Sequence, residues 1–214
     1  LAALIRTLLP PLPKDAPVLV AGLGSRAVTP DAVGPKVCDH VIATRHLITR
    51  SPEYFAAWRP VCALAPGVLG QTGVEANEVI RGVLDRVRPG AVIAVDALAA
   101  GRLSRLVRTV QLTATGIVPG SGVGNARAAL NEQALGVPVL AVGVPTVAAG
   151  GSIAHEIACQ LGGAACEALD DLSQPFIITT RDIDREVADT ARLIGYAVNM
   201  ALQGLSVEDI DLYL

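Results

Sequence analysis

Short runs of apolar residues alternate along this chain with segments in which apolar residues recur at helical spacing. The apolar runs lie at about 17–22, 61–65, 91–95 and 138–142, a further strand is predicted at about 109–113, and helical patterns lie at about 1–9, 29–47, 74–87, 152–161 and 180–203. Apolar runs of this length, bounded by glycine and proline, are typical of strands buried on both faces of a parallel sheet. The alternation predicts an α/β fold, a three-layer sandwich with a twisted, mainly parallel sheet flanked by helices.

Composition and length agree with this architecture. We expect residues 1–214 to form one domain, with a C-terminal helix at about 180–203 packing on it. Hydrophobic residues make up 51% of the chain and aromatic residues only 3%, so Val, Leu, Ile and Ala must form the core. A formal net charge of −3 gives no basic footprint for nucleic acid. The four cysteines include no C-x-x-C pair and are interpreted as small buried hydrophobes.

Two aspartates follow predicted strands. Asp31 comes after the first strand, across a glycine turn and Pro30, and Asp96 is the first polar residue after the run 91–95. Ligands of open α/β sheets bind at the carboxyl ends of the strands, so both acids are expected in one crevice. Two neighbouring carboxylates cannot both ionise cheaply, so one can activate a water while the other donates a proton. A plainer interpretation, a helix cap and a loop acid, stays open on pattern alone.

Other motifs give weaker indications. The turn 22–27 loosely matches a dinucleotide fingerprint, but Pro30 separates it from the helix and no acid follows at 42–50 for a ribose. His155, Glu156 and Cys159 lack the further ligands of a zinc site, and no G-x-S-x-G elbow indicates a serine hydrolase. Arg45 and His46 are interpreted first as cations at the C-terminus of the helix 29–47. No cofactor or metal is expected.

A series of motifs then indicates a family. These are T-P-D-A-V-G-P at 29–35, T-R-H at 44–46, R-P at 59–60, A-P-G-V at 65–68, V-D-A-L-A-A at 95–100, T-G-I at 115–117, P-G-S-G-V-G-N at 119–125 and G-V-P-T-V at 143–147. In this order and spacing the chain resembles the germination protease family of spore endopeptidases, from about 18 to 147 and again near 175–202. The hydrogenase maturation endopeptidases are similar to this family in fold.

The resemblance implies an atypical, metal-independent aspartic-type endopeptidase that degrades small acid-soluble spore proteins during germination, with Asp31 and Asp96 as its catalytic pair. It also implies a cytoplasmic protein of the spore interior, made as a zymogen and forming homo-oligomers, with no direct nucleic-acid or membrane partner. The substrate-binding positions carried over with the motifs are Gly24, Thr29, Arg45, His46, Gly120, Ser121, Gly122 and Asn125.

The chain also departs from the family pattern. Ala114 and Val118 replace an acid and a histidine of the family, Ser25 replaces an asparagine, and the segment 165–175 is shorter than the family's insertion. Two alternatives therefore stay open. One is a metal-assisted maturation-type peptidase with Asp31 and Asp96 as ligands, although no histidine follows a later strand. The other is a catalytically inactive binding or assembly homologue.

Overall fold

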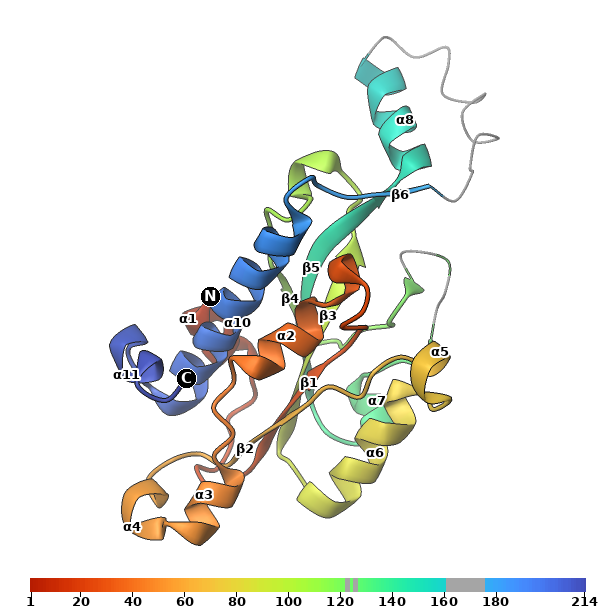
Figure 1. Cartoon of the computed structure of the whole chain (residues 1–214). Helices are drawn as coiled ribbons and strands as arrows, with labels where there is room; N and C mark the ends of the chain where they lie inside the picture. The colour runs from red at the N-terminus through yellow and green to blue at the C-terminus, as the bar shows by residue number, and fades with distance from the viewer. Residues whose placement is uncertain (122–123, 125–126, 161–175) are drawn as a thin grey trace.

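A mainly parallel sheet forms the centre of the computed structural model, which describes residues 1–121, 124, 127–160 and 176–214 (Figure 1). Its strand order is β2-β1-β3-β5-β4, with β6 paired to β5. β4 and β6 run antiparallel to β5, and the other pairings are parallel. The strands are β1 (Val18–Gly22), β2 (Val61–Leu64), β3 (Ala91–Ala99), β4 (Gln111–Thr113), β5 (Val139–Ala149) and β6 (Ile177–Ile178).

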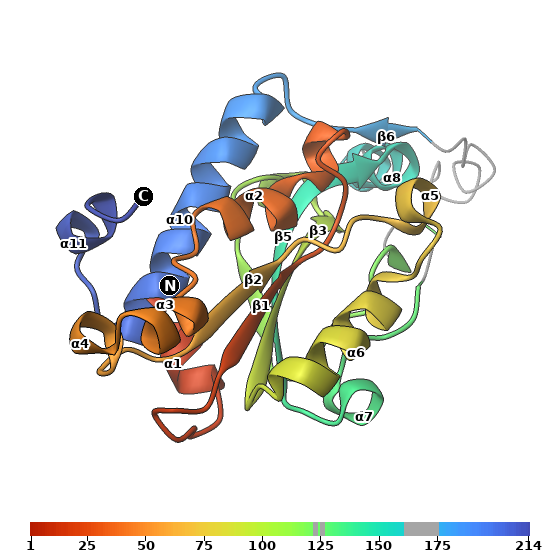
Figure 2. The ribbon, with the colours of Figure 1, turned by 60° about the horizontal axis from the view of Figure 1, so that its bottom comes forward.

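Helices cover both faces of the sheet, as Figure 2 shows. On one face, α1 (Ala2–Leu8), α2 (Val33–Asp39) and α10 (Ile183–Gln203) bury their apolar sides against alternate residues of β1, β3 and β5. On the other face, α6 (Ala76–Val87) packs on the intervening residues of β1 and β3. Both cores consist of Val, Ile, Leu and Ala. The predicted three-layer α/β fold is confirmed.

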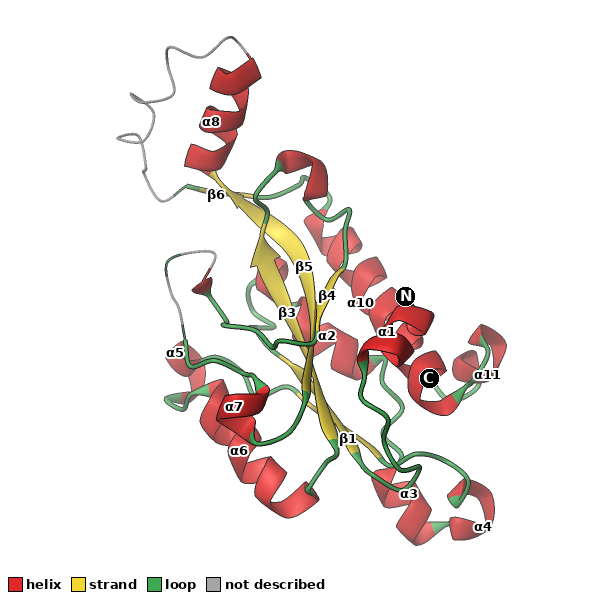
Figure 3. Ribbon diagram, turned by 180° about the vertical axis from the view of Figure 1, so that it is seen from behind, coloured by secondary structure: helices red, strands yellow, loops and turns green. Residues whose placement is uncertain are grey.

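The remaining helices lie around these layers (Figure 3). They are η1 (Thr29–Asp31), α3 (Arg45–Arg50), α4 (Pro52–Phe55), α5 (Leu69–Thr72), η2 (Leu103–Arg105), α7 (Glu132–Leu135), α8 (Gly150–Gln160) and α11 (Val207–Asp211). Of these, α8 projects from the end of β5 away from the sheet (Figure 3). Within the described residues, none of the helices has the length and apolar character needed to cross a bilayer.

The helix predicted over 29–47 is wrong in extent. The chain forms η1 and α2, leaves the helix at His40 and starts α3 only at Arg45. Two buried side chains hold the intervening loop. Asn199 of α10 accepts a hydrogen bond from the Ile42 N–H (2.9 Å) and donates one to the His40 carbonyl (2.8 Å), while the Thr44 hydroxyl donates to the Arg59 carbonyl and accepts from the Val61 N–H. Asn199 therefore pairs the His40 and Ile42 backbone groups that a continuous helix would have bonded within itself, and Thr44 ties the end of the loop to the chain that leads into β2.

The strands β3 and β5 also extend further than their apolar runs predict. The register pairs Gly22, the last residue of β1, with Val95, yet β3 continues to Ala99 beside β5. Asp96 therefore lies inside β3 and does not follow it. Because β1 stops four residues earlier in register, the sheet has a step at its carboxyl edge, and the candidate site lies in this step.

Candidate active site

A cavity of about 660 Å³ lies at the carboxyl ends of β1 and β3, and both Asp31 and Asp96 line it. The two acids are 65 positions apart in sequence, and the parallel pairing of β1 with β3 brings them to one edge of the sheet. The other walls are formed by the C-terminal part of β3, by the loop before α5 and by the chain around Gly120. Most of these wall residues are apolar.

A glycine turn positions Asp31. Gly24 has φ +108°, and a Cβ built on it would lie 2.0 Å from the Asp31 carbonyl oxygen and 2.9 Å from Oδ1 of its carboxyl group. Only glycine allows this approach. The next residue, Ser25, donates its backbone N–H to Asp31 Oδ2 at 2.7 Å. Partial burial raises the pKa of Asp31, and the Ser25 N–H opposes that rise by favouring the carboxylate.

Two further glycines bring α2 against this turn. A Cβ on Gly34 would lie 2.3 Å from the Leu23 carbonyl oxygen and 2.5 Å from the Val95 carbonyl oxygen, while one on Gly22 would lie 2.1 Å from the Gly34 carbonyl oxygen. The start of α2 therefore packs directly on the ends of β1 and β3. This contact fixes η1, and with it Asp31, relative to β3.

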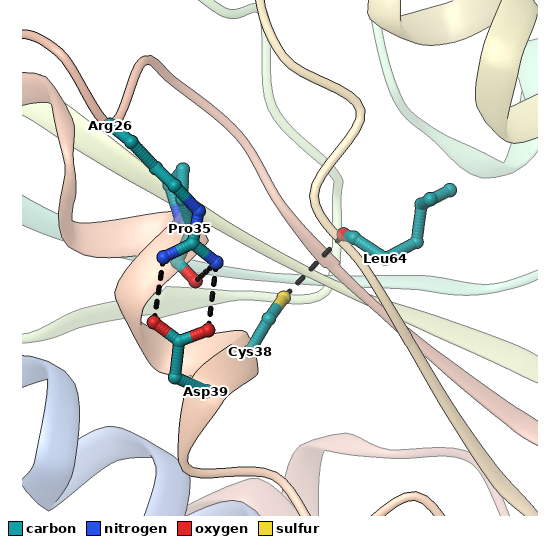
Figure 4. Close-up of polar contacts among 5 residues, drawn as sticks. All are labelled: Arg26, Pro35, Cys38, Asp39 and Leu64. Atoms are coloured by element: carbon teal, nitrogen blue, oxygen red, sulfur yellow. Dashed lines mark hydrogen bonds and ion pairs between the residues drawn. The ribbon is translucent and has the colours of Figure 1, made fainter.

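An ion pair holds the outer part of the turn on α2, as Figure 4 shows. The Arg26 guanidinium donates to both carboxylate oxygens of Asp39, at 2.6 and 2.8 Å, and to the Pro35 carbonyl at 2.9 Å. Because about half of each charged side chain is exposed, this pair adds little to stability and serves mainly to orient the loop.

Nearby, the Cys38 thiol donates to the Leu64 carbonyl, and burial raises the pKa of this thiol to about 11, so it remains protonated near neutral pH.

Asp96 is more deeply buried than Asp31, with only 4% of its surface exposed. Its Oδ1 accepts the N–H of Ala97 at 2.9 Å. Burial, and to a lesser degree the charge of Asp31, raises the pKa of Asp96 to about 7, against the opposing effect of the Ala97 N–H. Near neutral pH the cavity therefore presents two carboxyl groups in unlike environments, one of which readily holds a proton.

The structure brings some of the other predicted site residues to this cavity. Gly24, Gly120 and Ser121 line it, and Gly122 and Asn125 lie outside the described residues. Thr29 does not line it, and its hydroxyl donates to Asp184 of α10 at 2.9 Å.

Arg45 and His46 lie elsewhere. They open α3 and do not close the preceding helix, so the cation-at-C-terminus interpretation is wrong. Thr44, immediately before them, is bonded to Val61 at the amino end of β2, which is the opposite edge of the sheet from Asp31. The sequence resemblance gave no indication of this separation.

Several wall residues were not predicted. Arg127 and Glu75 line the cavity and form an ion pair at 3.6 Å, and the Thr146 hydroxyl, also in the wall, is buried without a partner among the described residues. Gln71 does not line the cavity but donates to the Ser25 hydroxyl at 2.8 Å. Thr146 lies in the G-V-P-T-V motif at 143–147, which indicates the family but gives this residue no role, and Gln71 lies in the short helix α5, which no apolar periodicity predicts. Among the residues that the structure describes, no three His, Cys, Asp or Glu side chains gather in a way that could hold a metal ion.

The fold and the cavity define an open α/β protein whose ligand site lies at the carboxyl edge of its sheet. The germination protease family matches residues 2–161. A germination protease of Caldanaerobacter subterraneus subsp. tengcongensis is 41% identical, over 94% of this chain and 70% of that protein. One of Bacillus velezensis is 51% identical, over 68% of this chain and 40% of that protein.

The chain therefore belongs to the germination protease family, and this membership supports a protease that acts in spores. Among solved structures, the chain is similar to a [NiFe] hydrogenase maturation protease, HycI, from Thermococcus kodakarensis KOD1. That protein is 14% identical with a TM-score of 0.48, over 92% of this chain and 99% of that one.

Proposed function

We propose that this protein is an aspartic-type endopeptidase whose catalytic groups are Asp31 and Asp96, and that it degrades small acid-soluble spore proteins. The single observation that carries the mechanism is the pair of unequally buried carboxyl groups in one cavity. Family membership supports peptide hydrolysis, and the spore-protein substrate follows from the sequence resemblance.

We further propose that residues 1–214 act as one domain, because α10 and α2 share one core with the sheet.

The different environments assign the roles. Asp31 is less buried and accepts the Ser25 N–H, so it is the group that ionises first and serves as the base for an attacking water. Asp96 is buried beside it and keeps its proton up to about pH 7, so it serves as the acid. The water gives its proton to Asp31 as its oxygen bonds to the peptide carbon. Asp96 protonates the carbonyl oxygen to give a gem-diol. As the C–N bond breaks, Asp31 gives the proton from the water to the leaving amine, and a gem-diol hydroxyl returns its proton to Asp96 as the new carboxyl group forms, so both acids end as they began.

The test is cleavage of a purified small acid-soluble spore protein by this chain, with and without a metal chelator. We expect fragments whose new ends map to internal peptide bonds, at the same rate in both conditions. Loss of cleavage with chelator, restored by a divalent metal, would support the metal-assisted alternative with Asp31 and Asp96 as ligands. No cleavage at any pH from acid to neutral would contradict the proposal and favour an inactive binding homologue.

A further inference from the structure

The edge of β3 beyond the end of β1 has an unusual environment for a central strand. From Ala91 to Val95, β3 is paired on both sides, with β1 and β5. From Asp96 to Ala99 it is paired with β5 alone, and no strand of the described residues pairs with its other side. This stretch of β3 lines the cavity, and Ala97, Leu98 and Ala99 are partly exposed, so the open edge faces the site and its solvent.

The direction of the backbone groups on this edge follows from the bonds of the residues around it. The Val95 carbonyl accepts the N–H of Leu23, so Val95 points its backbone groups towards β1. The N–H groups of Val92 and Ala100 donate to β5-side carbonyls, of Pro138 and Val147, so even-numbered residues of β3 point the other way. By strand alternation, Ala97 and Ala99 then present their N–H and C=O groups to the open side.

These groups leave a row of hydrogen-bonding positions beside the two acids. The Ala97 N–H is bonded to the carboxylate of its own neighbour, Asp96. The Ala97 carbonyl and both backbone groups of Ala99 have no protein partner on this side among the described residues. The segment Gly67 to Leu69, which follows β2, lines the cavity on the other side of the gap. Gly24 and Asp31 line the end of the gap nearest to β1. The gap is therefore the place that a longer β1 would fill.

We propose that the substrate binds in this gap as an extended strand, continuing the line of β1 and hydrogen-bonded through its main chain to Ala97 and Ala99. The inference rests on the proposed peptidase function and specifies how its substrate is held. An unpaired strand edge binds an extended peptide by main-chain bonds, which depend little on the peptide's side chains. The substrate peptide bond nearest to Gly24, where the bound strand continues from the end of β1, is then the one placed against Asp31 and Asp96. A helical segment cannot offer this row of main-chain groups, so the substrate must be extended where it is cut.

The experiment uses a synthetic peptide that spans the mapped cleavage site by about six residues on each side, the usual length of a strand. Single backbone amides, other than the one that is cleaved, are replaced by esters one position at a time. An ester removes one N–H donor and leaves every side chain unchanged. Each ester peptide is also matched by a control with the same side chains and an intact amide. The measured quantity is kcat/KM for the full chain.

We expect the loss to alternate along the peptide. Esters at positions that face β3 should reduce kcat/KM by about fivefold each, and esters at the positions between them should change it much less. A uniform or absent effect in a series whose parent peptide is cleaved would overturn strand binding and leave the peptidase function standing. Failure to cleave the parent peptide would overturn the proposed function, and this inference with it.

Discussion

Replacing Asp96 with asparagine should slow peptide hydrolysis by orders of magnitude and at the same time stabilise the folded protein above pH 7. Asparagine keeps the shape of the side chain but has no carboxylic acid proton to give to the carbonyl oxygen. We expect kcat to fall by about 10²- to 10⁴-fold, the usual contribution of a positioned acid or base. Asp31→Asn should cause a loss of similar size, because the attacking water then has no base.

The stability change follows from the sign of the pKa shift. The folded protein holds the Asp96 proton to about pH 7, whereas the unfolded chain releases it near the ordinary value of 3.8. The wild-type free energy of unfolding therefore falls as the pH rises between these values, by about 4 kcal/mol in total. Asp96→Asn carries no such penalty, so its melting temperature should exceed that of the wild type above pH 7 and not near pH 4.

The matched control for these variants is Asp15→Asn. Asp15 is exposed and lies in the loop that precedes β1, at the opposite edge of the sheet from the cavity. We expect this change to leave both kcat and the melting temperature unaltered. Wild-type activity in Asp31→Asn or Asp96→Asn, measured on folded protein, would remove that residue from the proposed mechanism.

A single methyl group on Gly24 should also disable the site. At φ +108° a Gly24→Ala side chain would lie 2.0 Å from the Asp31 carbonyl oxygen, so the turn and η1 must move apart. Displacement of Asp31 by about 1 Å is expected to reduce kcat by about 10²-fold. The backbone strain alone should lower the free energy of unfolding by about 1 kcal/mol.

Gly136→Ala is the control that separates strain from displacement. Gly136 also has a positive φ, +73°, but its added Cβ would meet no atom within 4 Å. It lies at the end of α7, before β5. We expect a similar small loss of stability with full activity. If Gly24→Ala retained full activity, the close contact between the turn and Asp31 would have no role in catalysis.

The layered fold could be predicted because its causes are local. Buried parallel strands require continuous apolar runs, and the runs at β1, β2 and β3 are short and bounded by glycine or proline. Both site acids were found for the same reason, since each comes at or near the carboxyl end of such a run. The capping box of Ser206 and Asp209 at the start of α11 is a local feature of the same kind, because its two side chains lie three positions apart in the sequence.

The parts that the sequence did not reveal depend on distant contacts. The break after α2 needs Asn199 of α10. Ahead of α10, the Thr179 hydroxyl donates to the carbonyl of Thr146, a residue 33 positions earlier in the chain. The extension of β3 past Asp96 depends on pairing with β5, which an alternation of apolar and polar residues cannot predict. The positions of Arg45 and His46 at the far edge follow from the same unexpected break.

The central claim, that Asp31 and Asp96 form one site, is tested most directly by titrating Asp96 in the wild type and in Asp31→Asn. The carboxyl ¹³C resonance of Asp96, assigned by its absence in Asp96→Asn, reports its protonation as the pH changes. The apparent pKa should be about 7 in the wild type and lower in Asp31→Asn, because the neighbouring charge is gone. It should stay above 3.8 because Asp96 remains buried. An identical Asp96 pKa in both proteins would show that the two carboxyl groups do not interact, and would contradict the paired-acid site.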